Sequence, residues 1–309
     1  MTDAIKVLIT GKGGQLATEL IKVFPNKFDV VALSSHELDI VDAESVERSI
    51  AAVKPAIVIN AAAYTAVDKA EDNQQRAFDV NYLGCENLAH ACKAAGCSLI
   101  HVSTDFVFDG KKATPYFVDD VPNPINVYGA SKLRGERGIT NVLEDAVVIR
   151  TAWVYSGTGN NFVKTMLSLM QNKPELSVIC DQIGTPTWAN GLAQFILHIA
   201  SKYGEGERQS LVPKPVTYHW TDAGVASWYD FAVAIRDLGI EKGILKQAIP
   251  INPIPASQYP LPAERPSFSV LDKTETEGST GFKTTHWRHQ LDKMLDEYTE
   301  DSKLSEGKT

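Results

Sequence analysis

Short apolar runs alternate with stretches of helical hydrophobic spacing through the first half of the 309-residue chain. Such runs predict buried strands, and apolar residues three or four positions apart predict helices packed on them. We expect strands at Ile5–Ile9, Val30–Leu33, Ala56–Asn60, Leu99–Ser103 and Ala146–Arg150, and helices at Leu16–Phe24, Ser45–Val53, Gln75–Ala95 and Tyr128–Gly138. This order predicts an α/β fold with a doubly wound, parallel, Rossmann-type sheet.

The pattern becomes irregular after about Thr151. Prolines cluster at Pro213–Pro215 and Pro250–Pro266, with one helix candidate, Ser227–Leu238, between the clusters. This predicts a smaller C-terminal lobe with long loops, which in α/β enzymes often carry the substrate site. We therefore expect a dinucleotide-binding domain at 1–152, to which later segments return, a mainly substrate-binding lobe at 153–299, and a disordered tail at 300–309.

Composition excludes several classes of function. The net charge of -8 disfavours nucleic acid as a partner, because neutralising phosphates needs clustered Lys and Arg. No stretch is apolar enough to predict a membrane span, and the first residues lack the apolar core of a signal peptide. The four cysteines show neither a CxxC pair nor a zinc pattern, so we expect free thiols in a cytoplasmic protein.

A glycine-rich loop joins the first strand to the first helix. Gly11 and Gly13 begin a GxGxxG pattern that fails at Leu16, whereas Gly11, Gly14 and Ala17 complete the GxxGxxA form. Gly11 allows the tight turn, Gly14 lets the backbone approach a pyrophosphate, and the helix N-terminus offers N–H groups to it. A glycine turn without a ligand is the alternative, but the strand–helix context favours a dinucleotide.

Other positions extend this cofactor prediction. The second strand ends in Leu33-Ser34-Ser35-His36, which contains neither the acid typical of NAD sites nor an arginine; the serines favour NADP without excluding NAD. Asp39 is interpreted either as a contact to adenine or as an ordinary helix cap. The predicted cofactor-binding set is Gly11, Gly13, Gly14, Gln15, Leu16, Asp39, Ile40, Ala61, Ala62, Ala63, Tyr64, Tyr128 and Lys132.

Tyr128 and Lys132 form a YxxxK pattern that places both side chains on one helix face. A free phenol has a pKa near 10, and a neighbouring ammonium stabilises the phenolate and lowers that pKa. Tyr128 is therefore predicted to protonate the oxygen of a carbonyl that receives hydride, with Lys132 beside it. Thr104 follows the strand Leu99–Ser103 at the sheet edge where ligands bind, so its hydroxyl is predicted to contact the same oxygen.

Longer segments carry a resemblance to a known family. The chain resembles the extended short-chain dehydrogenase/reductases, and in particular the dTDP-4-dehydrorhamnose reductase family. The similar segments are Gly11–Leu16, Val58–Glu71, Ser103–Gly110, Asn126–Lys132, Arg150–Tyr155, Asp181–Thr187 and Arg265-Pro266. The resemblance implies NADPH- or NADH-dependent reduction of the 4-keto group of dTDP-4-dehydro-L-rhamnose, with Thr104, Tyr128 and Lys132 as catalytic set. It further implies that Thr104, Asp105, Trp153, Asn161 and Arg265 contact the dTDP-sugar.

The resemblance leaves some alternatives open. Phe106 stands where related dehydratases carry an acid, which argues against dehydration. A reductase or epimerase acting on another nucleotide-sugar, or a non-catalytic subunit similar to the regulatory β subunit of methionine adenosyltransferase, would share these motifs. Some relatives bind magnesium at a homodimer interface, for which Glu19 is a candidate ligand. No acids show ligand spacing, so magnesium stays open and no metal site is predicted; a homodimer is likewise an open expectation.

Overall fold

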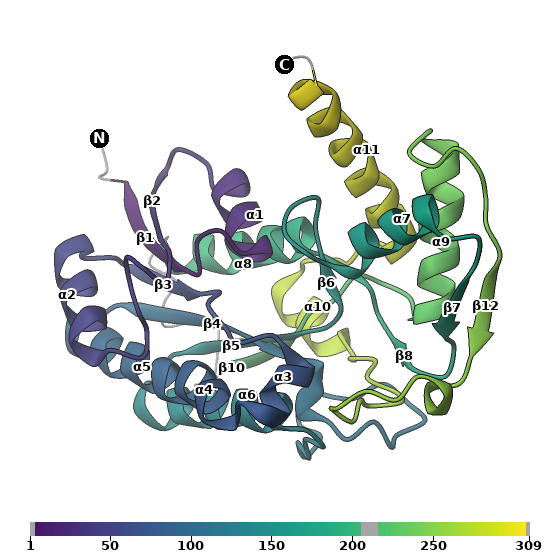
Figure 1. The fold of residues 1–309 in the computed structure, drawn as a ribbon. Helices are drawn as coiled ribbons and strands as arrows, with labels where there is room; N and C mark the ends of the chain where they lie inside the picture. Colours follow the sequence, from purple (N-terminus) through teal and green to yellow (C-terminus); the bar gives the residue numbers. More distant parts are fainter. Residues whose placement is uncertain (1–3, 205–215, 307–309) are drawn as a thin grey trace.

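The computed structural model describes residues 4–204 and 216–306, and within these ranges a central parallel sheet organises the molecule (Figure 1). Its six strands lie in the order β10-β5-β4-β3-β1-β2, and each pairs in parallel with its neighbours. Their bounds are β1 Ile5–Thr10, β2 Phe28–Leu33, β3 Ile57–Asn60, β4 Ser98–Thr104, β5 Val147–Thr151 and β10 Val216–His219. The predicted Rossmann-type sheet is confirmed.

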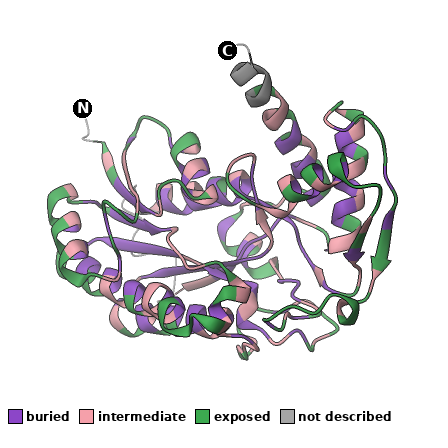
Figure 2. Cartoon of the chain, viewed as in Figure 1, coloured by how far each residue is buried: buried purple, intermediate pink, exposed green. Residues whose placement is uncertain are grey.

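Helices cover both faces of the sheet, because successive side chains of each buried strand point in opposite directions. Val7 and Ile9 of β1 pack with helices α1 and α8, whereas Leu8 packs with α2, α5 and α6. The bounds of these helices are α1 Gln15–Val23, α8 Ala189–Gly204, α2 Ala43–Val53, α5 Gly84–Ala95 and α6 Val127–Val142. Figure 2 shows the sheet buried between them.

The predicted helix Gln75–Ala95 is interrupted by a wider turn. Helix α4 covers Gln74–Phe78, a π-helical turn follows at Asp79–Leu83, and α5 continues from Gly84. Such turns insert one residue into a helix and often occur at functional sites. Here the turn places Asn81 inside the protein, where its Nδ2 donates to Ser131 on α6 and to the carbonyl oxygen of Tyr64.

The second half of the chain is more regular than its sequence indicates. A second apolar core contains Val163, Leu167, Phe231, Ile235 and Leu291, contributed by three helices. These are α7 Phe162–Asn172, α9 Trp228–Glu241 and α11 Trp287–Glu306, with strands β7 Leu176–Ile179 and β12 Ile251–Ile254 beside them (Figure 1). The predicted helix at Ser227–Leu238 is confirmed as α9, which Ser227 caps through Asp230.

Two segments of the second half pack with the first. Strand β10 pairs with β5 at the sheet edge, and α8 lies beside α1. The remaining elements are short: α3 Val67–Asp72, β6 Val154–Tyr155, β8 Ile183–Gly184, β9 Thr187–Trp188, β11 Ala226–Ser227 and α10 Thr274–Thr280. No helix in the described part of the chain is long and apolar enough to cross a membrane.

The tail prediction needs correction. Helix α11 extends to Glu306, so the described part of the segment 300–309 is helical rather than disordered. The reason lies upstream, where Leu291, Met294 and Leu295 bury one face of α11 in the lobe, and adding turns to an anchored helix is favourable. Residues 307–309 and the cluster Pro213–Pro215 lie outside the described residues.

Candidate active site

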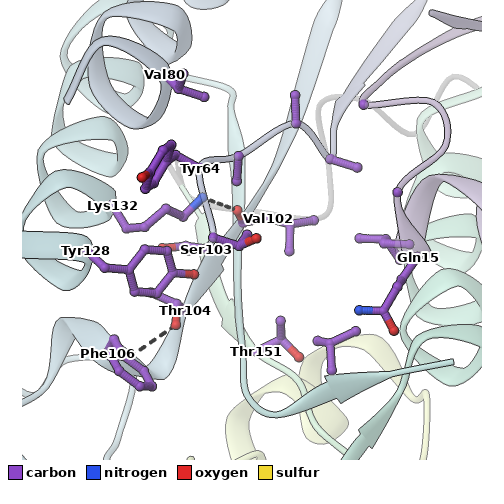
Figure 3. Close-up of a pocket in the computed structure, with 18 of the residues that line it drawn as sticks. Gln15, Tyr64, Val80, Val102, Ser103, Thr104, Phe106, Tyr128, Lys132 and Thr151 are labelled. Atoms are coloured by element: carbon purple, nitrogen blue, oxygen red, sulfur yellow. Dashed lines mark hydrogen bonds between the residues drawn. The ribbon is translucent and has the colours of Figure 1, made fainter. Parts of the chain in front are cut away.

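A cavity of about 790 Å³ opens at the carboxyl ends of β1, β3, β4 and β5 (Figure 3). The strand order reverses between β1 and β3, and crevices at such points are where open α/β sheets bind ligands. The predicted residues that line it are Gly11, Gly14, Gln15, Leu16, Asp39, Ile40, Ala61, Ala62, Ala63, Tyr64, Thr104, Asp105, Tyr128, Lys132, Trp153 and Arg265. Gly13 and Asn161 lie outside this lining.

The phosphate loop requires glycine at Gly11 for two physical reasons. Its φ of +79° is in the left-handed region, and a Cβ there would lie 2.9 Å from the carbonyl oxygen of Ala61. The loop closes through the N–H of Gly14, which donates to the carbonyl oxygen of Gly11 at 3.0 Å. Gly14 then caps α1 without a side chain, so the first N–H groups of this helix can bind phosphate.

Helix α6 approaches the end of β4 closely enough to bring the predicted catalytic residues together. Asn126 caps the helix by accepting from the N–H of Gly129, and a Cβ on Gly129 would lie 2.1 Å from the carbonyl oxygen of Phe106. Only glycine permits this contact. As a result, Tyr128, Thr104 and Lys132 share one wall of the cavity, opposite Gln15 of the phosphate loop (Figure 3).

The protonation of Tyr128 differs from the expectation. Its side chain borders the cavity, but desolvation of the hydroxyl raises the pKa of Tyr128 to about 12, with hydrogen bonding to Thr104 opposing the rise. The predicted lowering by the Lys132 ammonium is therefore wrong for this structure. The physical reason is that Nζ of Lys132 donates to the carbonyl oxygen of Val102 at 2.7 Å. Tyr128 is therefore protonated at neutral pH and has a proton to donate, although the raised pKa makes the free phenol a weaker acid.

Three buried polar atoms of the cavity wall have no hydrogen-bond partner among the described residues: Oγ of Ser103, Oδ2 of Asp105 and Oγ1 of Thr151. Native structures rarely leave such atoms unpaired, so they indicate that this wall meets a polar ligand. Burial also raises the pKa of Asp105 to about 6, against hydrogen bonds with Ser269 and Thr104. With the glycine cradle on the other side, these features fit a bound dinucleotide and an oxygen-rich substrate.

The lobe contributes two stacked tryptophans to the opposite side of the cavity. Trp153 and Trp228 lie with ring centroids 3.5 Å apart and planes 5° apart. Trp153 has a φ of +47°, an unusual backbone conformation for a bulky residue, and Gly184 leaves room for its ring. Trp228 was not among the predicted site residues, because its only signal in the sequence is the aromatic start of the predicted helix Ser227–Leu238.

Two predicted substrate contacts have other partners in the structure. Arg265 lines the cavity and forms two hydrogen bonds with Asp68, at 2.9 and 2.8 Å, although 197 residues separate them. Asn161 caps α7 by accepting from the N–H of Lys164, and its Nδ2 donates to Oε1 of Gln15 at 2.9 Å. Asn161 therefore joins the lobe to the phosphate loop instead of facing the cavity.

Glu19 also has protein partners. Its carboxylate is buried and accepts from Nζ of Lys22 at 2.9 Å and from Nδ2 of Asn190 at 3.0 Å. Within residues 4–204 and 216–306, no group of three or more His, Cys, Asp or Glu side chains is placed to hold a metal ion.

The fold and the site define the chain as a Rossmann-type NAD(P)-dependent oxidoreductase. The family model for the RmlD substrate binding domain matches residues 5–300. The dTDP-4-dehydrorhamnose reductase of Aggregatibacter actinomycetemcomitans is 40% identical over 288 residues, which are 93% of this chain and 97% of that protein. The chain belongs to the dTDP-4-dehydrorhamnose reductase family.

Solved structures agree with this assignment. The dTDP-4-dehydrorhamnose reductase of Clostridium acetobutylicum is 38% identical, with a TM-score of 0.87 and coverage of 94% of this chain and 99% of that one. The enzyme from Bacillus anthracis, solved in complex with NADP, is 32% identical, with a TM-score of 0.87 and coverage of 95% and 99%.

Proposed function

We propose that this protein reduces the 4-keto group of dTDP-4-dehydro-L-rhamnose to give dTDP-L-rhamnose, with NADPH or NADH as cofactor. The observation that carries the proposal is the shared cavity wall of Thr104, Tyr128 and Lys132, which faces the phosphate loop on one side and the lobe on the other. A carbonyl reduction needs a proton donor, a cofactor cradle and a substrate pocket in contact, and the arrangement of this cavity supports assigning it all three.

The cofactor would be held by Gly11, Gly14, Gln15 and Leu16 at its phosphates, by Asp39 and Ile40 near adenine, and by Ala61–Tyr64 along its length. When bound, the reduced nicotinamide supplies the hydride that carbon C4 of the sugar accepts. Lys132 lines the same wall as Tyr128 and would hold the ribose.

Tyr128 would supply the proton that the reduction needs in addition to the hydride. As the C4–oxygen double bond becomes a single bond, its electron pair moves to oxygen, and Oη of Tyr128 donates its proton there. Thr104 lines the same wall of the cavity as Tyr128, so its hydroxyl would orient the same oxygen. The phenolate left on Tyr128 regains its proton from solvent after the product leaves.

The sugar-nucleotide occupies the lobe side of the cavity in this proposal. The lobe is mainly residues 153–299, with α8 and β10 excepted because they pack with the sheet. Trp153 and Trp228 offer flat apolar faces to the sugar or the base, and Asp105 offers an unpaired carboxyl oxygen to a hydroxyl. Arg265 keeps N–H donors beyond those bound to Asp68 and suits a pyrophosphate.

The experiment supplies enzymatically generated dTDP-4-dehydro-L-rhamnose with NADPH or NADH and follows the absorbance of the reduced nicotinamide. We expect stoichiometric oxidation together with formation of dTDP-L-rhamnose. No oxidation with either cofactor would overturn the proposal, and sugar conversion without net oxidation would indicate an epimerase instead.

We further propose that the protein is located in the cytoplasm and forms a homodimer. Cys85, Cys92, Cys97 and Cys180 are free thiols, which suits a reducing compartment. Sedimentation of the purified protein would test the homodimer.

A further inference from the structure

The phosphate loop lies directly against the end of β2. The backbone N–H of Lys12 donates to the carbonyl oxygen of Leu33, the last residue of β2, at 3.0 Å. Lys12 and Ser35 both line the cavity, together with Asp39. In dinucleotide-binding folds, residues after the second strand contact the adenosine ribose, whose 2′ position carries a hydroxyl in NADH and a phosphate in NADPH. Lys12 thus reaches the one place where the two cofactors differ.

Glu37 is not part of the cavity lining itself, but its side chain lies beside Lys12, which is. Its Oε2 accepts from the N–H and from Oγ of Ser34, each at 2.8 Å, and lies 3.8 Å from Nζ of Lys12. These hydrogen bonds from Ser34, supported by the Lys12 charge, lower the pKa of Glu37, so its carboxylate is ionised at neutral pH. The chain therefore has both a cation and an acid at this position, although the residues immediately after β2 are serines.

We propose that Lys12 and Glu37 together set the preference between NADPH and NADH. This inference rests on the proposed function in one respect, that the ligand of the cavity is a nicotinamide dinucleotide. Lys12 attracts the 2′-phosphate as its counter-charge. Glu37 repels that phosphate and instead accepts a hydrogen bond from the 2′-hydroxyl of NADH.

Ser34 holds the acidic member of the pair. Its hydroxyl donates to Glu37, so it cannot donate to a 2′-phosphate until the carboxylate moves away. Since Lys12 and Glu37 are each about half exposed, at 50% and 47%, both side chains can change rotamer without unpacking the core. The pair therefore keeps the preference between NADPH and NADH small, because Lys12 favours NADPH, Glu37 favours NADH, and either side chain can move to let the other cofactor bind.

Equilibrium binding tests the pair without any sugar substrate. We would measure the Kd of NADPH and of NADH by the change in nicotinamide fluorescence for the wild type, Lys12→Gln and Glu37→Gln. Lys93→Gln on α5 and Glu47→Gln on α2 are matched controls, since both residues are exposed and each variant removes one charge of the same sign from a helix instead of from the Lys12–Glu37 pair. Competition by adenosine 2′,5′-bisphosphate and by ADP would measure how strongly each variant binds an adenosine with and without a 2′-phosphate, in the absence of the nicotinamide.

For Lys12→Gln we expect the Kd of NADPH to rise roughly tenfold, the scale of one lost hydrogen bond to a charged group, while that of NADH changes little. For Glu37→Gln we expect the NADPH Kd to fall several-fold and the NADH Kd to rise. The steeper salt dependence of NADPH binding should disappear in Lys12→Gln.

Equal changes for both cofactors in either variant, or changes matched by the controls, would overturn the inference. Because no dTDP-sugar is present, a failure of the proposed reductase activity would leave these binding results unaffected. Conversely, suppose that the wild type reduces the dTDP-sugar while Lys12→Gln keeps the wild-type preference between NADPH and NADH. That result would refute the role of Lys12 and Glu37 and leave the proposed function intact.

Discussion

Nε2 of His101 lies 3.3 Å from Nζ of Lys132, in a part of the protein that solvent does not reach. On the other side of the ring, Nδ1 of His101 lies 3.0 Å from Nδ2 of Asn60. The oxygen of the Asn60 amide accepts from Thr10 and from the N–H of Ala62, which fixes the orientation of the amide. A fixed Asn60 therefore holds the imidazole in place behind the catalytic lysine.

This arrangement determines the position of the imidazole proton. Because Nδ2 of Asn60 can only donate, Nδ1 of His101 accepts, and the neutral ring carries its proton on Nε2. Burial and the Lys132 charge hold the pKa of His101 well below its ordinary value, and burial lowers the pKa of Lys132. With its proton on Nε2, His101 directs a donor at Nζ of Lys132, which opposes the ammonium form, while Nζ itself donates to the carbonyl oxygen of Val102.

We predict that His101→Phe lowers kcat roughly tenfold and shifts its pH profile, since Lys132 loses a buried partner. His101→Gln, whose amide can still donate, should recover part of the rate. The measurements are kcat against pH and the free energy of unfolding. A stable His101→Phe protein with the wild-type pH profile would contradict a positioning role.

Tyr128→Phe should reduce kcat by roughly 10²–10⁴-fold, the scale of one general acid. Because the pKa of Tyr128 is raised to about 12, the wild type should show no loss of rate from phenol ionisation at pH values well below that. Single-turnover rates of both proteins would test this. A variant as fast as the wild type would exclude Tyr128 as proton donor.

Gly11→Ala should weaken cofactor binding far more than Gly13→Ala. Both glycines have positive φ, +79° and +91°, so both substitutions introduce backbone strain. Only at Gly11 would the new Cβ meet a neighbour, 2.9 Å from the carbonyl oxygen of Ala61; at Gly13 no described atom lies within 4 Å. Thermal unfolding and the Kd of NADPH would separate strain from contact. Equal Kd values for both variants would contradict the steric argument.

Asn161→Ala should lower stability by about 1 kcal/mol through loss of the α7 cap. Asn161→Ser keeps a capping oxygen but cannot donate to Gln15 as the amide does. We expect Ser to restore the free energy of unfolding, while cofactor binding stays weakened in both variants because Gln15 keeps only the longer hydrogen bond from Ser156, at 3.3 Å, and loses the one from Asn161 at 2.9 Å. Full recovery of NADPH affinity in Asn161→Ser would show that the link to Gln15 is unimportant.

Asp222→Asn should stabilise the protein near neutral pH. Burial raises the pKa of Asp222 from 3.8 to about 7, and its Oδ1 has no partner among the described residues. The folded state therefore binds this proton more tightly than the unfolded chain. That stabilisation is complete below pH 3.8 and is lost as pH rises through about 7.

Asp222→Asn cannot ionise, so its free energy of unfolding does not fall in this way as the pH rises. The difference in free energy of unfolding between Asp222→Asn and the wild type should grow from acidic to neutral pH, by at most about 4 kcal/mol. Denaturant melts at both ends of this range would measure it. A difference that does not change with pH would mean that Asp222 titrates normally.

Features that depend on local sequence were predictable. Apolar runs and glycine turns identified five of the six strands of the sheet and the phosphate loop, because burial periodicity and left-handed turns depend on neighbouring residues. Strand β10 was not predicted. The spacing of Tyr128 and Lys132 placed both on one helix face for the same reason. Thr104 followed from its position directly after a buried strand.

Tertiary structure alone decided what depends on segments far apart in the chain. It stacked Trp228 on Trp153, paired Arg265 with Asp68, and turned Asn161 towards Gln15. Packing also reversed the expected pKa of Tyr128, because desolvation depends on every group around a hydroxyl and not on its helix neighbours alone. The sequence thus determined which residues could perform the chemistry, and the fold decided their partners and their charges.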